Sequence, residues 1–582
     1  RLSGVGSYFA GVNRIRPRLT NNPTTQLSDA TLNASADLLD VGNGLSFGTQ
    51  GSILQRQAPA VEYSRRAFGL VSLDSSGDLR FLAPNDGAEK TRLWTPGDLH
   101  LGAAQIYPAT GIQAEVRAGY QGAVPVSQHT LRISGHGAAP AAVPYSAFGT
   151  LILSAADIEQ GGVLRAPLGK IVLGDDLLST THEVRLLPGS LTSVSGAGLV
   201  MPYGGTTDGI DYRYNGKSVV LNGITGETSG VSIGTQYADV QSGAVIDLSG
   251  GGDVRGAGFI SGRGGSTDAR YHPLVRNNPD GSFSLPGLAD NPVYAIVPGV
   301  QASVAPEAVA GEPSGSMPLV GQQITLDAGI PGLPAGTYTL LPASYALLPG
   351  AYRVEVNGQA SVGAPQAGAM ALRNGSWGLT GKRSIAGSGL GDALSQHLIL
   401  TGADTLRRYS QYNETSFSQF LLNDAARLGI PRAALPIDAK GLTLDLGHND
   451  TTRPGFSMQG VLLNKPADKG HGSIATVLFG DTLVIHGDNA PATPGAGETA
   501  IAASQLNALG ASSLRIGHAG QRVYGQGGNQ LLFGDARGTS IVLKGGAHLK
   551  AAEVLMVTGR IAGAINIEQG ASIDTLGQGA PA

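Results

Sequence analysis

The 582-residue chain contains no cysteine. Disulfides, thiolate nucleophiles and Cys-ligated zinc or iron–sulfur sites are therefore excluded. Charged residues are also scarce, at 14% of the chain, and the formal net charge is −4. This balance gives no basic surface of the kind that nucleic acid or anionic lipid requires, so we expect no nucleic-acid partner. A chain without cysteine also suits export through an oxidising compartment, where stray thiols are trapped as disulfides.

The chain has no convincing membrane-spanning run. One uncharged stretch, Gly137 to Ala156, contains Pro140 and Pro144 and is a poor membrane helix, so we expect no membrane insertion. The sequence begins at Arg1 without an initiator Met or a signal-peptide apolar region. We therefore expect a mature or excised portion of a longer product.

Sequence motifs for catalysis and cofactor binding are largely missing. We find no G-x-G-x-x-G, P-loop or H-E-x-x-H, and the 11 His residues are scattered. Gly44 to Gly48 has the spacing of a nucleophile elbow, but no helical pattern follows, so the sequence favours a plain turn. Gly250 to Asp253 resembles half of a calcium-binding nonapeptide in a single copy, where a turn is again favoured. We expect no cofactor and no metal.

Glycine, in contrast, is abundant: 88 of 582 residues, or about 15%, roughly twice the usual share. Glycine destabilises the interior of a helix, so this composition argues against helical bundles and α/β enzymes. Collagen is excluded because glycine has no three-residue period. Short alternating runs of Val, Ile, Leu and Ala indicate a folded, β-rich chain.

A repeated pattern of Gly-x-apolar-x-apolar suggests how the strands are arranged. It begins at Gly77 and again at Gly97, then at Gly149 and again at Gly169, each pair twenty residues apart. Near the C-terminus, 541–549 aligns with 565–573 at an offset of 24. A β-sandwich also gives short strands, but it does not predict a fixed return of the inward residues. The sequence therefore predicts an all-β fold, a right-handed parallel β-helix in which each coil stacks on the next.

Two stretches interrupt this pattern. Residues 273–349 hold 12 of the 32 prolines, which cannot donate to a sheet ladder, so we expect an ordered Pro/Gly-rich insertion packed on the solenoid. Ser416 to Leu428 reads as a short capped helix with an apolar stripe at Phe417, Phe420, Leu421 and Leu428, and Ile501 to Leu509 as another. The expected divisions are 1–249 (β-helix), 250–360 (insertion), 361–440 (transition with the helix near 416–428) and 441–582 (β-helix).

Several segments resemble a known family. Residues 149–169, GTLILSAADIEQGGVLRAPLG, and 188–195, PGSLTSVS, resemble large filamentous-haemagglutinin-like exoproteins of Gram-negative bacteria, in their middle or C-terminal shaft region. Residues 294–299, 335–342 and 513–517 resemble the same family, so the resemblance spans roughly residues 70 to 575.

The resemblance implies two-partner secretion, in which an outer-membrane transporter exports the chain and a β-helical fibre forms at the cell surface. It also implies a non-catalytic adhesin of the secreted or cell-surface kind, which mediates cell adhesion or contact with surfaces or biofilm matrix through an unknown receptor. Three features of the family are missing: the Asn-Pro-Asn motif of the secretion domain, for which Asn21 to Pro23 is no match, an Arg-Gly-Asp, and a toxin tail.

Two other functions remain open. One is the stalk of a contact-dependent growth-inhibition toxin, which uses a similar rod. The other is a β-helix polysaccharide-acting enzyme, whose carboxylates would cluster in a groove on one strand face. The acidic residues in the relevant part of the chain mostly follow turns, where Asp is common. They are Asp157, Asp175, Asp176, Asp247 and Asp253.

If the chain binds a partner, the interruptions of the solenoid are the expected place, because binding residues usually lie on segments held by a rigid scaffold. The candidate binding residues are Tyr294, Tyr338, Tyr345 and Tyr352. The alternative is that these tyrosines cap the flank of the solenoid, since their Leu-Pro neighbours read as buried.

Overall fold

The structure is a computed structural model of the whole chain, and its residues fall into two compact units. The stacked unit comprises Arg1–Leu199, Asn222–Gly252 and Ala433–Ala582, and the inserted unit comprises Val200–Leu221 and Asp253–Arg432. The structure describes residues 14–17, 26–47, 52–55, 61–64, 66–84, 88–121, 124–125, 128–136, 142–174, 181–207, 209–218, 223–224, 229–262, 267–273, 276–277, 283–284, 291–300, 305–307, 312–359, 368–430, 432–446, 454–488, 494–524, 530–533, 536, 538–559 and 563–582.

The all-β prediction is confirmed. In the part of the chain that the structure describes, strands far outweigh helices, at 48% against 7%. The abundance of glycine and the scarcity of helix-favouring charged residues account for this balance, because glycine interrupts helices but suits tight turns between short strands. Among the described residues, no helix has the length and apolar character needed to cross a membrane.

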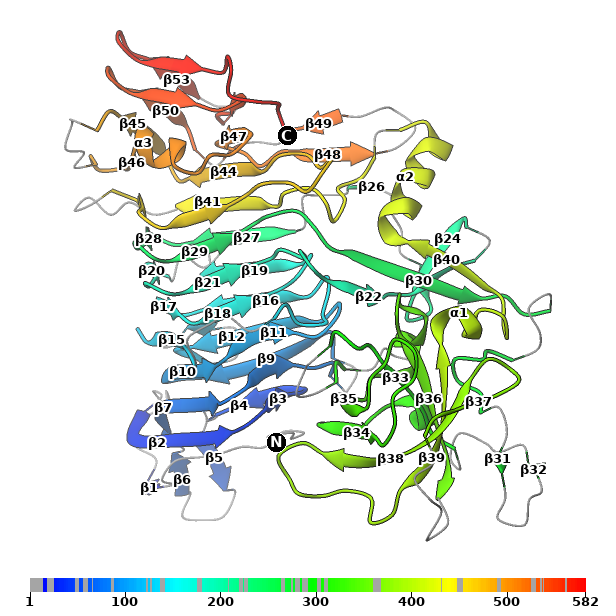
Figure 1. Cartoon of the computed structure of the whole chain (residues 1–582). Coiled ribbons are helices and arrows are strands. Elements are labelled where there is room, and N and C mark those ends of the chain that lie inside the picture. The colour runs from blue at the N-terminus through cyan, green and yellow to red at the C-terminus, as the bar shows by residue number, and fades with distance from the viewer. Residues whose placement is uncertain are drawn as a thin grey trace. The chain divides into compact units, whose positions relative to one another are not determined.

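Three long parallel sheets build the stacked unit, and Figure 1 shows their strands lying one above another from β2 to β47. The first sheet contains β2 (Gln26–Ala36), β7 (Arg66–Ser75), β10 (Asp98–Ala103), β15 (Thr130–Gly135), β17 (Asp157–Gly161), β20 (Glu183–Leu186), β28 (Tyr237–Val240) and β42 (Phe456–Met458). The second contains β3 (Leu39–Val41), β8 (Asp78–Phe81), β11 (Gln105–Pro108), β18 (Val163–Arg165), β21 (Leu191–Ser193), β29 (Val245–Asp247) and β43 (Val461–Leu463). The third contains β4 (Gly44–Ser46), β9 (Lys90–Thr95), β12 (Gln113–Ala118), β16 (Thr150–Ser154), β19 (Lys170–Gly174), β27 (Gly230–Gly234), β41 (Gly441–Leu446), β44 (Ile474–Phe479), β47 (Ser513–Ile516) and β52 (Glu553–Met556).

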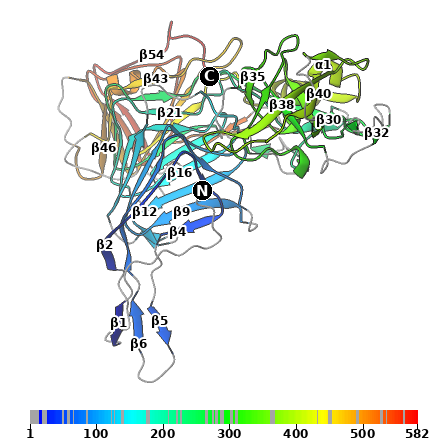
Figure 2. The ribbon, with the colours of Figure 1, turned by 60° about the horizontal axis from the view of Figure 1, so that its bottom comes forward.

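The chain visits these three sheets in the same order over most of the stack, but the round of β15 and β16 has no strand in the second sheet, so β11 pairs directly with β18. Strands β7, β8 and β9 lie in the first, second and third sheets, and β10, β11 and β12 repeat that order one step further along each sheet. In the view of Figure 2, β2 of the first sheet is seen apart from β4, β9 and β12 of the third. Where the order holds, a strand pairs with the strand one round earlier and the strand one round later.

Alternation within each strand fills a single core. Leu99 and Leu101 of β10 are buried, with His100 between them on the outer side, and they pair with Val71 and Leu73 of β7. One apolar cluster collects such residues from all three sheets, from Leu39 to Ala551. Fully burying one side chain of this kind contributes about 1.5–3 kcal/mol, so the stack is stabilised by one continuous core.

The repeat predictions have mixed outcomes. Thr150 pairs with Lys170 and Leu151 with Ile171, as the pattern predicted. Ile541 pairs with Ile565, and Leu549 with Ile573, which confirms the offset of 24. The predicted repeat between Gly77 and Gly97 was wrong. These glycines precede strands of two different sheets, β8 in the second and β10 in the first.

The turn predicted at Gly44 to Gly48 was also wrong. Gly44–Ser46 is strand β4, and it pairs in parallel with β9 because Leu45 and Phe47 fit the inward alternation. Gly48 and Asn21 to Pro23 lie outside the described residues. Gly250 has a different role from a turn, since a Cβ atom there would overlap the carbonyl oxygen of Ile437.

Smaller sheets complete the stacked unit. One parallel sheet contains β46 (Glu498–Ala502), β45 (Thr482–His486), β50 (Ser540–Leu543) and β53 (Ala564–Ile567), and another pairs β51 (His548–Lys550) with β54 (Ser572–Asp574). Antiparallel pairings join β1 (Arg14–Pro17), β6 (Val61–Ser64) and β5 (Ser52–Gln55); β13 (Tyr120–Gln121) and β14 (Val124–Pro125); and β26 (Gly223–Ile224), β48 (Gln521–Tyr524) and β49 (Gln530–Leu532). Helix α3 (Ala503–Asn507) is shorter than predicted, because Ile501 belongs to β46.

The inserted unit is built mainly on antiparallel pairing. Its largest sheet contains β33 (Val293–Ile296), β36 (Tyr352–Gln359), β39 (Gln396–Gly402), β38 (Trp377–Ile385), β34 (Gln322–Leu326) and β35 (Gly336–Thr339), with β37 (Met370–Ala371) on β38. Three smaller sheets hold β22 (Val200–Pro202), β30 (Asp253–Phe259) and β40 (Tyr412–Ser416); β23 (Gly205–Thr207), β24 (Asp211–Tyr214) and β25 (Lys217–Ser218); and β31 (Arg276–Asn277) and β32 (Phe283–Ser284). Two 3-10 helices, η1 (Ser314–Ser316) and η2 (Ala343–Leu347), and helix α1 (Ala403–Leu406) connect these strands.

The helix predicted near 416–428 is helix α2 (Phe417–Leu428). The Ser416 hydroxyl accepts a hydrogen bond from the Gln419 amide at 3.0 Å, and Gly429 ends the helix in the left-handed conformation with φ 65°. Phe417, Phe420 and Leu421 are buried as predicted, but Leu428 is 49% exposed. The apolar stripe therefore ends one turn earlier than the sequence suggested.

Candidate functional site

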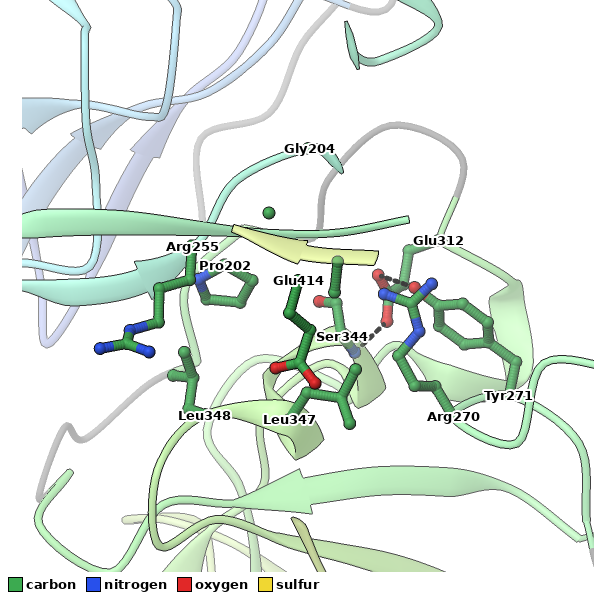
Figure 3. A pocket seen from close by; sticks show the side chains of 12 residues that line it. Pro202, Gly204, Arg255, Arg270, Tyr271, Glu312, Ser344, Leu347, Leu348 and Glu414 are labelled. Carbon is green, nitrogen blue, oxygen red and sulfur yellow. Dashed lines mark hydrogen bonds between the residues drawn. The ribbon is translucent and has the colours of Figure 1, made fainter. Parts of the chain in front are cut away.

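The inserted unit contains a cavity of about 200 Å³ (Figure 3). Its walls come from segments that are far apart in the sequence. The lining residues are Pro202, Gly204, Arg255, Gly256, Ala257, Arg270, Tyr271, Glu312, Ser344, Leu347, Leu348 and Glu414.

Strand pairing positions one wall of this cavity. Arg255 of β30 pairs with Pro202 of β22 on one side, and Ala257 of the same strand pairs with Glu414 of β40 on the other. Because residues two apart in a strand point to the same face, Arg255 and Ala257 share one side of β30. Helix η2 supplies Ser344 and Leu347 from the opposite direction.

Glu312 is the most enclosed carboxylate of the cavity. Its Oε1 atom accepts hydrogen bonds from the Ser344 amide at 3.0 Å and the Ser316 hydroxyl at 3.4 Å, and its Oε2 atom accepts from the Tyr271 hydroxyl at 3.4 Å. Burial raises the pKa of Glu312 above its usual value, although these hydrogen bonds and Arg270 oppose the shift. The protonated form is therefore favoured here more than in water.

Glu414 has a different environment. Arg407 holds it with two hydrogen bonds, Nε to Oε1 at 2.6 Å and Nη2 to Oε2 at 2.8 Å. The same guanidinium donates to the Leu347 carbonyl at 2.6 Å and pairs with Asp404 at 3.0 Å. Such a fork-shaped pair fixes the position of the carboxylate.

The Arg270 side chain is held by neighbouring residues of the protein. It pairs with Asp268 at 2.7 Å, and its guanidinium lies 5.0 Å from the Tyr271 ring centre and 5.1 Å from that of Tyr412. Although burial would raise the pKa of Asp268, its hydrogen bonds and charge interaction with Arg270 lower it below the usual range. Tyr412 also donates to Asp268 at 2.8 Å, so this group forms a rigid side of the cavity.

Arg255 contrasts with Arg270. Its side chain is exposed, and no residue that the structure describes forms an ion pair or hydrogen bond with its guanidinium. Figure 3 shows Arg255 and Glu312 on opposite sides of Glu414. The cavity thus offers one free cation, one fixed carboxylate and one enclosed carboxyl to a ligand.

The four predicted tyrosines do not line this cavity. Tyr294, in β33, and Tyr345, in η2, are buried, with 6% and 2% of their surfaces exposed. Tyr338 and Tyr352 are half-buried, and their hydroxyls donate to the carbonyls of Pro334 and Pro331, both at 2.7 Å. Tyr294, Tyr338 and Tyr352 come together around the core of the antiparallel sheet. Their packing fits the alternative in which the rings fill space, and their role in binding stays a prediction.

The carboxylates considered for a groove are dispersed. Asp157 lies in the first sheet, where it pairs with Glu183, and Asp247 lies in the second sheet, where it accepts from Ser193 and Ser249. Asp253 belongs to the inserted unit and accepts from Ser418 at 3.3 Å. Asp175 and Asp176 lie outside the described residues.

No local pattern in the sequence points to the residues that line the cavity. Arg255, Glu312 and Glu414 come from three separate segments, and only the folded inserted unit brings them together. Within the described part of the chain, no group of three or more His, Asp or Glu is arranged to hold a metal ion.

Comparisons with known proteins do not assign the chain. No family model matches it, and neither the curated proteins nor the solved structures contain a match.

Proposed function

We propose that the stacked unit is a right-handed parallel β-helix. Three parallel sheets that the chain visits in the same order over most of the stack, with one shared core, support this architecture. The handedness rests on a general rule, because connections between parallel strands of one sheet are right-handed in about 98% of cases.

On this basis, the chain serves as a structural and adhesive shaft that carries the inserted unit for contact with cells, surfaces or matrix. The observation that carries this proposal is the register across the insertion. Val231 of β27 pairs directly with Leu442 of β41, although the whole Asp253–Arg432 segment lies between them in the sequence. A stack that continues unbroken across such an insertion is suited to presenting a domain, and the cavity gives that domain a ligand site.

The resemblance of the sequence extends the proposal to cell biology. A filamentous-haemagglutinin-like exoprotein would be secreted through an outer-membrane two-partner transporter and act at the bacterial cell surface. The stalk of a contact-dependent growth-inhibition toxin is the alternative with the same shaft, and the part beyond the shaft would distinguish them.

Removing the inserted unit's larger segment tests the proposal. The Gly251 amide donates to the Pro436 carbonyl at 2.8 Å, so a short glycine linker can join Gly252 to Ala433 without residues 253–432. Surfaces coated with this deletion variant should lose attachment of cells relative to the full chain. Arg255→Gln, which leaves the fold intact, should reduce attachment in the same direction.

Circular dichroism and thermal melting would establish that the stacked unit of the deletion variant is folded. Attachment equal to that of the full chain, for both the deletion and Arg255→Gln, would overturn the proposal.

A second candidate function, a polysaccharide-acting enzyme, is favoured by the two glutamates of the cavity. Burial favours the protonated form of Glu312, as a general acid requires, and Arg407 fixes the position of a second glutamate, Glu414, in the same cavity. Release of reducing ends from a panel of polysaccharides, lost in both Glu312→Gln and Glu414→Gln but retained in the control Glu498→Gln, would support it. No release by the full chain would reject it for those substrates.

A further inference from the structure

A cluster of cations surrounds a tryptophan on the third sheet of the stacked unit. Lys90, Arg92 and Trp94 alternate with buried residues along β9 and so share its outer face. In β12, Glu115 pairs with Arg92, and Arg117 with Trp94. We call these five residues the basic cluster.

The charges of the basic cluster are not balanced. Lys90 donates to Glu115 at 2.7 Å, but the nearest atoms of Arg92 and Arg117 lie 3.7 and 3.9 Å from the same carboxylate. These two distances are beyond hydrogen-bond range. One carboxylate therefore faces three cations, and only the lysine is hydrogen-bonded to it.

Four N–H groups of the cluster are buried and have no hydrogen-bond acceptor among the described residues. They are Arg92 Nε, Trp94 Nε1, Arg117 Nε and Arg117 Nη1. The guanidiniums of Arg92 and Arg117 lie 5.3 and 5.6 Å from the Trp94 ring centre, and Arg117 lies 5.3 Å from that of Tyr120. These ring contacts fix the side chains but supply no acceptor for the N–H groups. Buried donors are nearly always satisfied in folded proteins, so several unmet donors at one place indicate a missing acceptor.

The cluster is also open on one side. Gly44 of β4 pairs with Arg92, and a Cβ atom at Gly44 would meet nothing within 4 Å. The side chain of Arg92 is 42% exposed. A small group can therefore approach Arg92 from the direction of β4.

We propose that the basic cluster binds an oxyanion, a carboxylate or sulfate group, whose oxygens accept from Arg92, Arg117 and the Trp94 indole. Guanidinium forks match the planar carboxylate and the tetrahedral oxyanions, and an indole N–H adds a donor without charge. The chain as a whole carries a net charge of −4, which concealed this local excess of positive charge. The site lies in the stacked unit and does not depend on the cavity of the inserted unit.

Binding at the basic cluster can be followed by the fluorescence of Trp94, because Trp377 is the only other tryptophan of the chain. In full-length protein carrying Trp377→Phe, Trp94 fluorescence would be titrated with sodium sulfate, with galacturonate and with oligogalacturonate. Sodium chloride would keep the ionic strength constant. We expect a saturable change with at least one of the oxyanions. Tighter binding of the oligomer than of the monomer would identify an acidic polymer as the source of the group, and equal binding would identify the free anion.

Arg117→Gln should weaken this binding at least tenfold, whereas Lys544→Gln, which removes a cation already paired with Glu568 on another sheet, should leave it unchanged. Because Arg117 also packs on rings, circular dichroism would check the fold, and Arg92→Gln gives a second variant at a more exposed position. The proposal is overturned if no oxyanion gives a saturable change, or if both arginine variants bind as tightly as the parent.

Discussion

The two units of this chain use β-strands in opposite ways. In the stacked unit, parallel strands repeat one arrangement, and each coil depends on its neighbours to cover the core. In the inserted unit, antiparallel strands enclose a separate core, and polar groups are buried with their partners. Arg353 and Glu355 form an ion pair whose side chains are both 0% exposed, and Asn291 and Asn357 donate to the same carboxylate.

This difference explains why one unit can contain the other in sequence. A coil needs only the register of the coil before it, and β41 finds that register on β27. The cost of closing a loop rises slowly with its length, so a long insertion that folds on its own adds little to the cost of stacking. Specific side chains then matter most in the inserted unit, and backbone fit matters most in the stack.

The largest effect should come from breaking the buried ion pair. Arg353→Met removes the cation with which buried Glu355 forms its ion pair, and we expect a loss of about 3–5 kcal/mol in the stability of the inserted unit. Hydrogen exchange should accelerate in β36 and β39 but not in β16 and β19. The double variant Arg353→Met, Glu355→Leu should recover part of the loss. Equal acceleration in both units would contradict the separation between them.

A pair of glycine variants tests how much the close approach of backbones in neighbouring coils contributes to stability. Gly174 and Gly189 both have positive φ, 90° and 83°, but a Cβ atom at Gly174 would overlap the Gly234 carbonyl, whereas at Gly189 it would meet nothing within 4 Å. Gly189→Ala should cost about 1–2 kcal/mol from φ alone, and Gly174→Ala about 2–5 kcal/mol because overlap is added. Urea unfolding followed by circular dichroism measures both. Equal losses would mean that close approach between coils is unimportant.

Lys440 lies just after the point where the chain returns from the inserted unit to the stack, and its burial predicts a pH dependence of stability. It is buried, its Nζ donates to the carbonyls of Leu435, Pro436 and Asp438, and burial lowers its pKa from 10.5 to about 8. Between pH 8 and 10.5 the unfolded chain binds more protons at this lysine, so stability should rise with pH by at most about 3 kcal/mol. Below pH 8 this contribution is constant. Comparing urea midpoints of the parent and Lys440→Met across that window isolates the effect, and parallel pH curves would refute it.

The smallest effect is expected at the surface of the last coils. Lys544 Nζ lies 2.9 Å from Glu568 in the neighbouring coil, with side chains 48% and 36% exposed. Exposed pairs of this kind are screened by solvent and contribute little. Lys544→Gln should therefore leave the thermal midpoint of the stack unchanged within error. A clear fall would show that outer ladders, and not only the core, hold the coils together.

The sequence predicted the stack where coils are short and uninterrupted. Residues 541–549 and 565–573 pair as expected. Only one coil of 24 residues separates β50 from β53, and the same holds for β51 and β54. Gly77 and Gly97 were misassigned because the same local pattern begins strands of different sheets, and residue spacing alone cannot tell them apart. Where long segments intervene, as between Val231 and Leu442, no repeat was visible at all.

The inserted unit was harder to predict. Its prolines suggested an interruption, but antiparallel register depends on partners that lie far away, such as Val354 of β36 and Leu400 of β39. The same reason hides the cavity, because Arg255, Glu312 and Glu414 are ordinary residues in their own segments. Helix α2 was predictable because its signals, Ser416 at the start and Gly429 at the end, are local.

The hydrogen bond between the Gly251 amide and the Pro436 carbonyl has a mechanical consequence. If a fibre built on this stack is stretched, tension at this point passes through the ladder of β27 and β41, because the two chain ends of the insertion are already fastened side by side. The Asp253–Arg432 segment lies outside that load path. A segment attached in this way is shielded from pulling forces that strain the shaft, whereas Pro202 and Gly204 of the cavity belong to the separate Val200–Leu221 segment.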